Sequence, residues 1–227
     1  MPRRYTWLVI LSLIGVNILV TETLLGTRAG WQLYWILTST VVLLAAVGVS
    51  NLYVQGGMQL RHIAWFTLIL GFYDIFFDFV YPILGRLADA FEGQPLDPSI
   101  GFAMGAYNAN IGLGDLLVYC LFIIAAYKGF GKRGAIASFV IIAIFGALLP
   151  SISPLIISAV TRTIGITIPA QVSFGPVALI TYYWLARSTP ERSMAEWFST
   201  QAAVGRQSAR TLRRVRPVAG GQGVGGR

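Results

Sequence analysis

Two aspartates lie within apolar stretches of the chain, where a charged side chain is costly. Asp74 lies inside the run 65–81, and Asp115 lies near the start of the run 112–124. An acidic group at the centre of a membrane helix costs about 2.5–3.5 kcal/mol on insertion scales, which makes it a candidate functional residue. Two carboxyl groups that face each other in a low-dielectric site share one proton. The ionised one can activate water while the protonated one donates to a carbonyl oxygen, so the pair is suited to peptide hydrolysis without a metal or cofactor.

Two further acidic residues lie in or beside apolar runs. Asp78 follows Asp74 by one helical turn and shares its face of the helix. Asp78 is therefore a proton-holding neighbour, a structural hydrogen-bonding group or the catalytic group itself, and helical geometry alone does not choose between it and Asp74. Glu22 lies near the end of its run, where it can reach the membrane interface, and a structural role is favoured there.

Two glycines precede Asp115, in the order Gly112-Leu-Gly114-Asp115. Because glycine has no side chain, we expect another backbone to come within contact distance of the carboxyl group here. The alternative is ordinary packing of small residues between membrane helices.

The composition is that of a membrane protein. Of the 227 residues, 56% are hydrophobic and only 11% are charged, against about 25% charged in soluble domains. The single Cys120 and the single His62 exclude an internal disulfide framework and a multi-histidine metal site. The net charge of +8 comes largely from the C-terminal tail and indicates a membrane surface, not nucleic acid, as its partner.

The elements that must position the two aspartates are membrane helices of about 20 apolar residues each. We expect an all-α integral membrane protein whose polytopic domain covers 1–187. The segment 154–168 is broken by Arg162 and bounded by prolines, which indicates a short interfacial or re-entrant piece. The predicted spans are 6–26, 32–54, 62–84, 110–128, 134–153 and 169–187.

The basic residues predict the orientation of these spans. With the N-terminus in the cytoplasm, fourteen of the 17 lysines and arginines fall on the cytoplasmic side. Both termini are therefore predicted to be cytoplasmic, in a multi-pass protein of the cell membrane. The tail 188–227 is basic and glycine-rich at its end, so we expect it to be partly disordered and to contact anionic lipid. A solvated anchor is favoured over an amphipathic helix at 191–212.

Three short motifs lie on the third, fourth and sixth predicted spans, namely Tyr73-Asp74, Gly112-Leu113-Gly114-Asp115 and Pro169-Ala170-Gln171. Together these motifs resemble the presenilin and signal peptide peptidase family of intramembrane aspartyl proteases, and the signal peptide peptidase branch in particular. The first two motifs match the family pattern in full, and the third departs from it at Gln171, where the family usually has leucine. The resemblance covers about residues 65–187.

The resemblance implies a fold, a site and a class of substrate. It implies a shortened presenilin-type core with six spans where the family usually has nine, and it leaves open both an active monomer and a homo-oligomer. Its catalytic pair would be Asp74 and Asp115, acting on single-span membrane segments or remnant signal peptides. The implied supporting residues are Tyr73, Gly112, Gly114 and Asp78, and the implied substrate-binding residues are Pro169, Ala170 and Gln171.

A transmembrane substrate must unwind before it can be cleaved, and its backbone then needs hydrogen-bond partners away from water. Strand addition to protein backbone supplies such partners. We expect the segment at Pro169-Ala170 and the loop before Gly112 to provide them, since Pro169 keeps the residue before it extended.

Three other functions fit parts of the sequence. Intramembrane acids also mark the path of a transporter or a proton-coupled channel, although no inverted repeat is evident. A prepilin-type peptidase also uses an aspartate after Gly-x-Gly, but basic residues usually follow its motif, whereas 116–127 is uncharged. An inactive scaffold that binds membrane helices would keep the same fold.

Overall fold

The computed structural model of the chain describes residues 3–81, 86, 90–91, 93–104, 107–161, 168–200 and 202–203. The chain divides into two compact units, Met1–Glu191 and Arg192–Arg227. In the second unit residues 194–200 are helical. Most of the tail predicted to be disordered lies outside the described residues, as does the end of the possible amphipathic helix.

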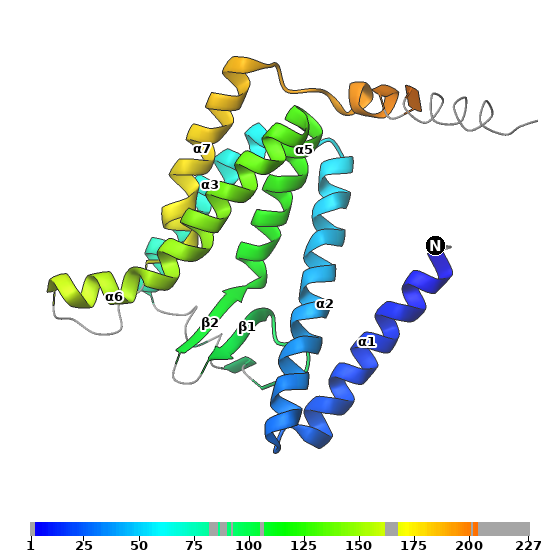
Figure 1. Cartoon of the computed structure of the whole chain (residues 1–227), viewed down its shortest axis with the longest axis vertical. Coiled ribbons are helices and arrows are strands. Elements are labelled where there is room, and N and C mark those ends of the chain that lie inside the picture. The colour runs from blue at the N-terminus through cyan, green and yellow to red at the C-terminus, as the bar shows by residue number, and fades with distance from the viewer. Residues whose placement is uncertain are drawn as a thin grey trace, which may run out of the picture. The chain divides into compact units, whose positions relative to one another are not determined.

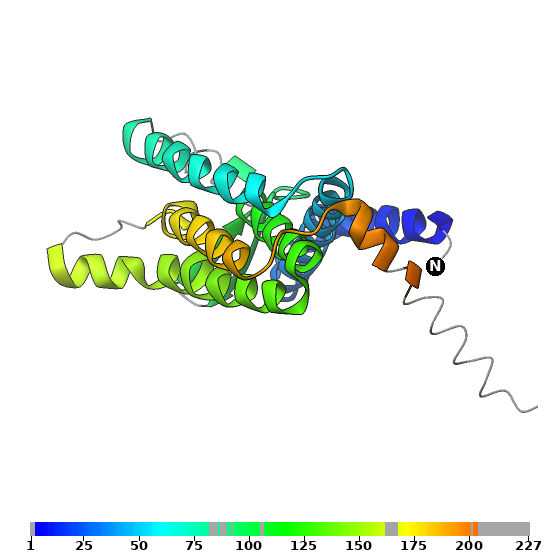
Figure 2. The ribbon, with the colours of Figure 1, turned by 90° about the horizontal axis from the view of Figure 1, so that it is seen from above.

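The first unit is mostly helical, which confirms the helical part of the predicted fold (Figure 1). Helices α3, α5 and α7 pack side by side, α2 packs on α5, and α1 packs on α2 (Figures 1 and 2). The helices are α1 (Arg3–Leu24), α2 (Arg28–Gln55), α3 (Leu60–Ile75), α5 (Leu113–Ile141), α6 (Leu149–Thr161) and α7 (Ala170–Ser188), with π-helical segments η1 (Phe76–Val80) and η2 (Ile142–Leu148).

Two helical stretches among the described residues are long and apolar enough to cross a membrane, Arg28–Gln55 and Leu113–Val160. Leu8–Leu24 is apolar but shorter. Large apolar side chains such as Leu52, Ile136 and Ile180 are exposed on the outside of the bundle. These features support membrane association, while six spans and their orientation stay predictions.

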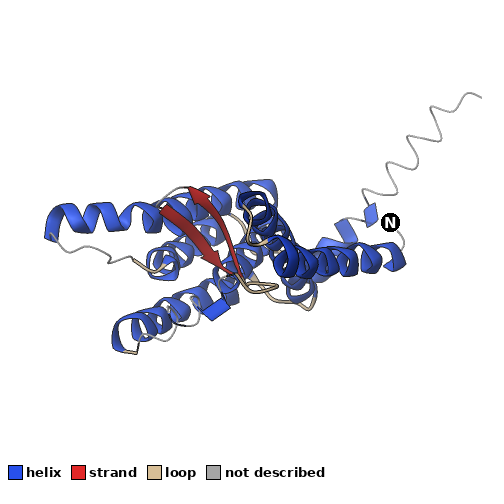
Figure 3. Ribbon diagram, turned by 90° about the horizontal axis from the view of Figure 1, so that it is seen from below, coloured by secondary structure: helices blue, strands red, loops and turns tan. Residues whose placement is uncertain are grey.

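A β-hairpin precedes α5 and was not predicted (Figure 3). Strand β1 (Ser99–Met104) pairs antiparallel with β2 (Tyr107–Gly112), so that Ser99 lies opposite Gly112. The predicted span 110–128 therefore begins too early, because its first three residues are engaged in strand pairing. The helix begins at Leu113, whose amide donates to the Pro98 carbonyl at 2.7 Å.

A glycine separates the fourth and fifth predicted spans. Gly131 adopts φ 74° and ψ −157° within α5, a conformation that side chains disfavour. The chain turns so tightly here that a Cβ atom on Gly134 would lie 2.5 Å from the Ala126 carbonyl oxygen.

The helix that follows the fifth predicted span runs past the predicted end at 153, because α6 continues to Thr161 with Pro154 inside it. That 154–168 is an interfacial or re-entrant piece stays a prediction. Proline has no amide to donate to the carbonyl four residues earlier. The Ser153 hydroxyl donates to that carbonyl, the one of Pro150, at 2.7 Å. A side chain thus replaces the missing backbone hydrogen bond, and the helix extends past the proline.

The core lies between α3, α5 and α7. Phe122 and Phe174 are fully buried and meet edge to face, with ring centroids 5.3 Å apart. Tyr119 also packs edge to face on Phe174, at the same centroid distance. These aromatic contacts join α5 to α7, two of the helices that carry the predicted motifs.

Candidate active site

Asp115 lies in the first turn of α5, directly after the hairpin, and is partly buried. One of its carboxyl oxygens, Oδ1, accepts a hydrogen bond of 2.8 Å from Nε2 of Gln171. The bond joins residues far apart in the sequence, and it brings the start of α7 to the aspartate at the start of α5. Two of the predicted motifs therefore meet through their side chains.

Gln171 is buried in spite of its polar side chain, with 2% of its surface exposed. Pro169 is the N-cap of α7 and adopts an extended conformation, with φ −57° and ψ 141°. Ala170 is the first helical residue, so Gln171 lies in the first turn of α7. Among the described residues, the second polar atom of its amide, Oε1, has no hydrogen-bond partner.

Asp74 lies near the C-terminal end of α3 and is partly buried. The preceding turn of α3 touches α7, because a Cβ atom on Gly71 would lie 2.8 Å from the backbone oxygen of Gln171. One turn further along α7, a Cβ atom on Gly175 would lie 3.0 Å from the Cα atom of Leu68. Glycines on both helices thus allow their backbones to touch, and Asp74 follows Gly71 by three residues on the same face.

Tyr119 interacts with both aspartates, and it follows Asp115 by one turn of α5. Its hydroxyl is buried, interacts electrostatically with Asp115 and Asp74, and donates to the Gly146 carbonyl at 2.8 Å. Gly146 is needed at this contact, since a Cβ atom there would lie 2.8 Å from the tyrosine ring. Both predicted catalytic aspartates are therefore close enough to the Tyr119 hydroxyl to interact with it electrostatically.

Gly112 and Gly114 do not lie against another backbone, contrary to the expectation from their sequence. Both are exposed, and a Cβ atom on either would meet no atom within 4 Å. Gly112 ends β2 and is the N-cap of α5. The space beside Asp115 is therefore unfilled where the hairpin joins the helix.

The remaining predicted residues lie further from this contact or are only partly described. Tyr73 is 47% exposed, and its ring packs on Phe77 with centroids 4.2 Å apart, on the outer surface of the helix. Asp78 lies in η1, and its side chain lies outside the described residues. Glu22 is exposed near the end of α1.

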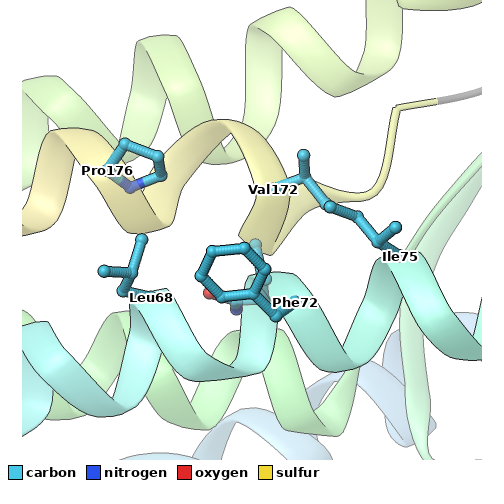
Figure 4. Close-up of a pocket in the computed structure, with 7 residues that line it drawn as sticks. Leu68, Phe72, Ile75, Val172 and Pro176 are labelled. Atoms are coloured by element: carbon cyan, nitrogen blue, oxygen red, sulfur yellow. The ribbon is translucent and has the colours of Figure 1, made fainter.

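A small apolar hollow of about 150 Å³ lies between α3 and α7 next to the aspartate–glutamine contact (Figure 4). Phe72 and Leu68 face Val172 and Pro176 across it (Figure 4). Gly71 and Gln171 also line it, so one wall of the hollow is the close contact between the two helices. An apolar side chain of a few carbon atoms fits such a volume.

Three residues of this arrangement were not singled out from the sequence, namely Tyr119, Gly71 and Gly175. The available signal was their spacing. Tyr119 lies four residues after Asp115, Gly71 lies three before Asp74, and Gly175 lies four after Gln171, so each shares a helix face with a predicted site residue. Among the described residues, no group of three histidine, cysteine or acidic side chains could hold a metal ion.

Comparisons with protein-family models, with curated proteins and with solved structures gave no match to this chain.

Proposed function

We propose that this protein is an intramembrane aspartyl endopeptidase that hydrolyses single-span membrane segments or remnant signal peptides. The observation that carries the proposal is the hydrogen bond between Gln171 and Asp115. Gln171 also lies against the helix that bears Asp74. Three short motifs, each of little specificity alone, therefore lie on three helices in mutual contact.

The proposed reaction needs only the two carboxyl groups and water. The ionised carboxylate takes a proton from water as the water oxygen bonds to the carbonyl carbon, and the other carboxyl group gives its proton to the carbonyl oxygen. The gem-diol that forms then breaks its C–N bond. The nitrogen takes the proton gained from water, and a gem-diol hydroxyl returns a proton to the second carboxylate, so the pair ends as it began.

The surroundings of Asp115 suit an extended substrate. The unfilled space at Gly112 and Gly114 leaves room for a peptide beside the carboxyl group. The hairpin that ends at Gly112 offers strand edges, and pairing with them would give an unwound substrate the hydrogen bonds that the membrane interior lacks. The hollow between α3 and α7 would receive an apolar side chain.

In this proposal the chain lies in the cell membrane with six spans and with both termini in the cytoplasm. The positive charge of the cytoplasmic segments and the tail would then face anionic lipid. Membrane-spanning peptides are the proposed substrates, and association into a homo-oligomer is compatible with activity.

A cleavage assay with the purified full chain in liposomes tests the function. With a single-span reporter, Asp74→Asn and Asp115→Asn should each lower the cleavage rate by at least about 100-fold, because each removes one half of the acid–base pair. Asp78→Asn should have a milder effect. Glu22→Gln is the matched control, since it neutralises an exposed acid on α1.

Two outcomes would contradict the proposal. If wild-type protein does not cleave the reporter but moves protons or solute in a manner that depends on Asp74, the chain is a transporter or channel. If it binds the reporter and neither cleaves it nor carries charge, it is a scaffold. If Asp78→Asn abolished cleavage and Asp74→Asn did not, the catalytic pair would be Asp78 and Asp115.

A further inference from the structure

The amide of Gln171 has two chemically different ends, and the structure uses them differently. Nε2 can only donate, and it donates to Asp115 at 2.8 Å. Oε1 can only accept, and it is buried without a hydrogen-bond partner among the described residues. A buried acceptor without a partner is costly, so the amide is matched to its surroundings only if a proton donor reaches Oε1.

The ionised form of Asp115 is the form that suits the N–H donor of the Gln171 amide. An ionised carboxylate accepts hydrogen bonds and has none to donate, so it takes the amide N–H and is stabilised by it. Two carboxyl groups in one site do not both ionise, and the proton they share then belongs to Asp74. The protonated Asp74 is an O–H donor, which is the kind of group that Oε1 lacks.

The helix packing places Asp74 on the correct side for this role. The backbones of α3 and α7 touch at Gly71 and Gln171, and Asp74 follows on the same face of α3 one turn later. Tyr119 is a further titratable group that interacts with both carboxyl groups, and its proton is donated to the Gly146 carbonyl.

From these contacts we infer that Gln171 is a positioning residue that makes the aspartate pair asymmetric. Its N–H group holds Asp115 as the ionised member, the base that takes a proton from water. Its carbonyl oxygen favours the proton on Asp74, the acid that donates to the substrate carbonyl. Leucine, which the family that this chain resembles usually has at this position, carries neither group. The inference rests on the proposed function and assigns the two roles within it.

The test replaces the amide by a side chain of similar shape that forms no such hydrogen bonds, Gln171→Met. A hydrogen bond to a charged group contributes enough to move a titration by about one pH unit. In the liposome cleavage assay at pH 4–8, the acidic limb of the rate profile should move about one unit to higher pH, and the maximal rate should fall by about 10-fold. Gln55→Met, at an exposed position on α2, is the matched control and should keep the wild-type profile.

A second measurement is independent of activity. In the Asp74→Asn background, Asp115 can be titrated by the infrared band of its protonated carboxyl group, with and without Gln171→Met. Asp115 should protonate at a higher pH, by about one unit, once the amide donor is lost.

The two measurements separate the two hypotheses. If wild-type protein does not cleave the reporter, the proposed function fails, and the infrared titration still decides the role of Gln171. If wild-type protein cleaves, but Gln171→Met keeps both the wild-type rate profile and the wild-type titration of Asp115, the role of Gln171 is refuted and the proposed function stands.

Discussion

At the residue scale, side-chain hydroxyls supply hydrogen bonds that the backbone of η2 and α6 leaves unmade. The Leu149 amide donates to the carbonyl five residues back, that of Ile144, and Pro150 has no amide to donate. The carbonyl of Phe145 then accepts a hydrogen bond from Ser173, and the carbonyl of Gly146 accepts one from Tyr119. These hydroxyls come from α7 and α5, so the irregular helix is fastened to both helices that meet at the candidate site.

Removal of the Tyr119 hydroxyl should therefore destabilise the protein. In Tyr119→Phe the Gly146 carbonyl loses its hydroxyl donor in a buried position, which should lower the free energy of unfolding by about 1–3 kcal/mol. Denaturant unfolding in detergent micelles measures this change. Tyr183→Phe is the control, since Tyr183 is exposed on α7. Equal stability of the two variants would show that the hydroxyl contributes nothing.

At the element scale, the contact between α3 and α7 decides whether the motifs meet. Gly71 and Gly175 let the two backbones touch, and this contact fixes the distance between the helix of Asp74 and the side chain of Gln171. Small residues that permit close approach are a general device of helix packing in membranes.

A side chain at this contact should separate the helices. Gly71→Ala would place a carbon atom 2.8 Å from a backbone oxygen, so α3 must move away from α7. We expect a loss of stability of about 1–3 kcal/mol and a fall in cleavage of at least about 10-fold. Gly48→Ala is the matched control, because a Cβ atom there meets nothing within 4 Å. Wild-type activity of Gly71→Ala would contradict this role of the contact.

The sequence predicted helices well and their irregular ends poorly, for physical reasons. Long apolar runs identify α2 and α5 because the hydrophobic pattern is local. The hairpin escaped prediction because the pairing of Ser99 with Gly112 is a contact between segments, which no local pattern encodes. The fifth predicted span ends too early, at 153, because the hydroxyl of Ser153 compensates for Pro154 only once the helix has formed. At the site, the aspartates stand out by their cost in an apolar run, whereas the Gln171 contact depends on how α7 packs.

At the scale of the whole first unit, one carboxyl group ties three helices together at the end of α7. Glu191 accepts a hydrogen bond of 2.5 Å from the Leu60 amide at the start of α3. It also packs on α5, where a Cβ atom on Gly129 would lie 3.0 Å from its Cγ atom. Burial raises the pKa of the Glu191 carboxyl, and the amides of Leu60 and Arg61 oppose this effect in part.

This shift predicts a pH-dependent stability. The pKa of Glu191 is higher in the folded chain than its ordinary 4.5. The stability that this group contributes is therefore fully present below pH 4.5 and is lost as the pH rises through the folded pKa. The melting temperature of wild-type protein should therefore fall across this window, and less so in Glu191→Gln, which keeps an acceptor for the Leu60 amide. Glu196→Gln, at an exposed position, should behave as wild type. An identical pH dependence in Glu191→Gln and wild type would contradict the prediction.

The contact between Gly71 and Gln171 also has a consequence for biosynthesis. The two positions are 100 residues apart, and α7 is the last helix of the first unit to leave the ribosome. Asp74 and Asp115 are both synthesised before Gln171 exists to bind Asp115, because synthesis runs from the N-terminus. A nascent chain that has not yet produced α7 therefore carries both aspartates without the Gln171 contact, and under the proposed function it would not hydrolyse neighbouring membrane segments until synthesis of this unit is complete.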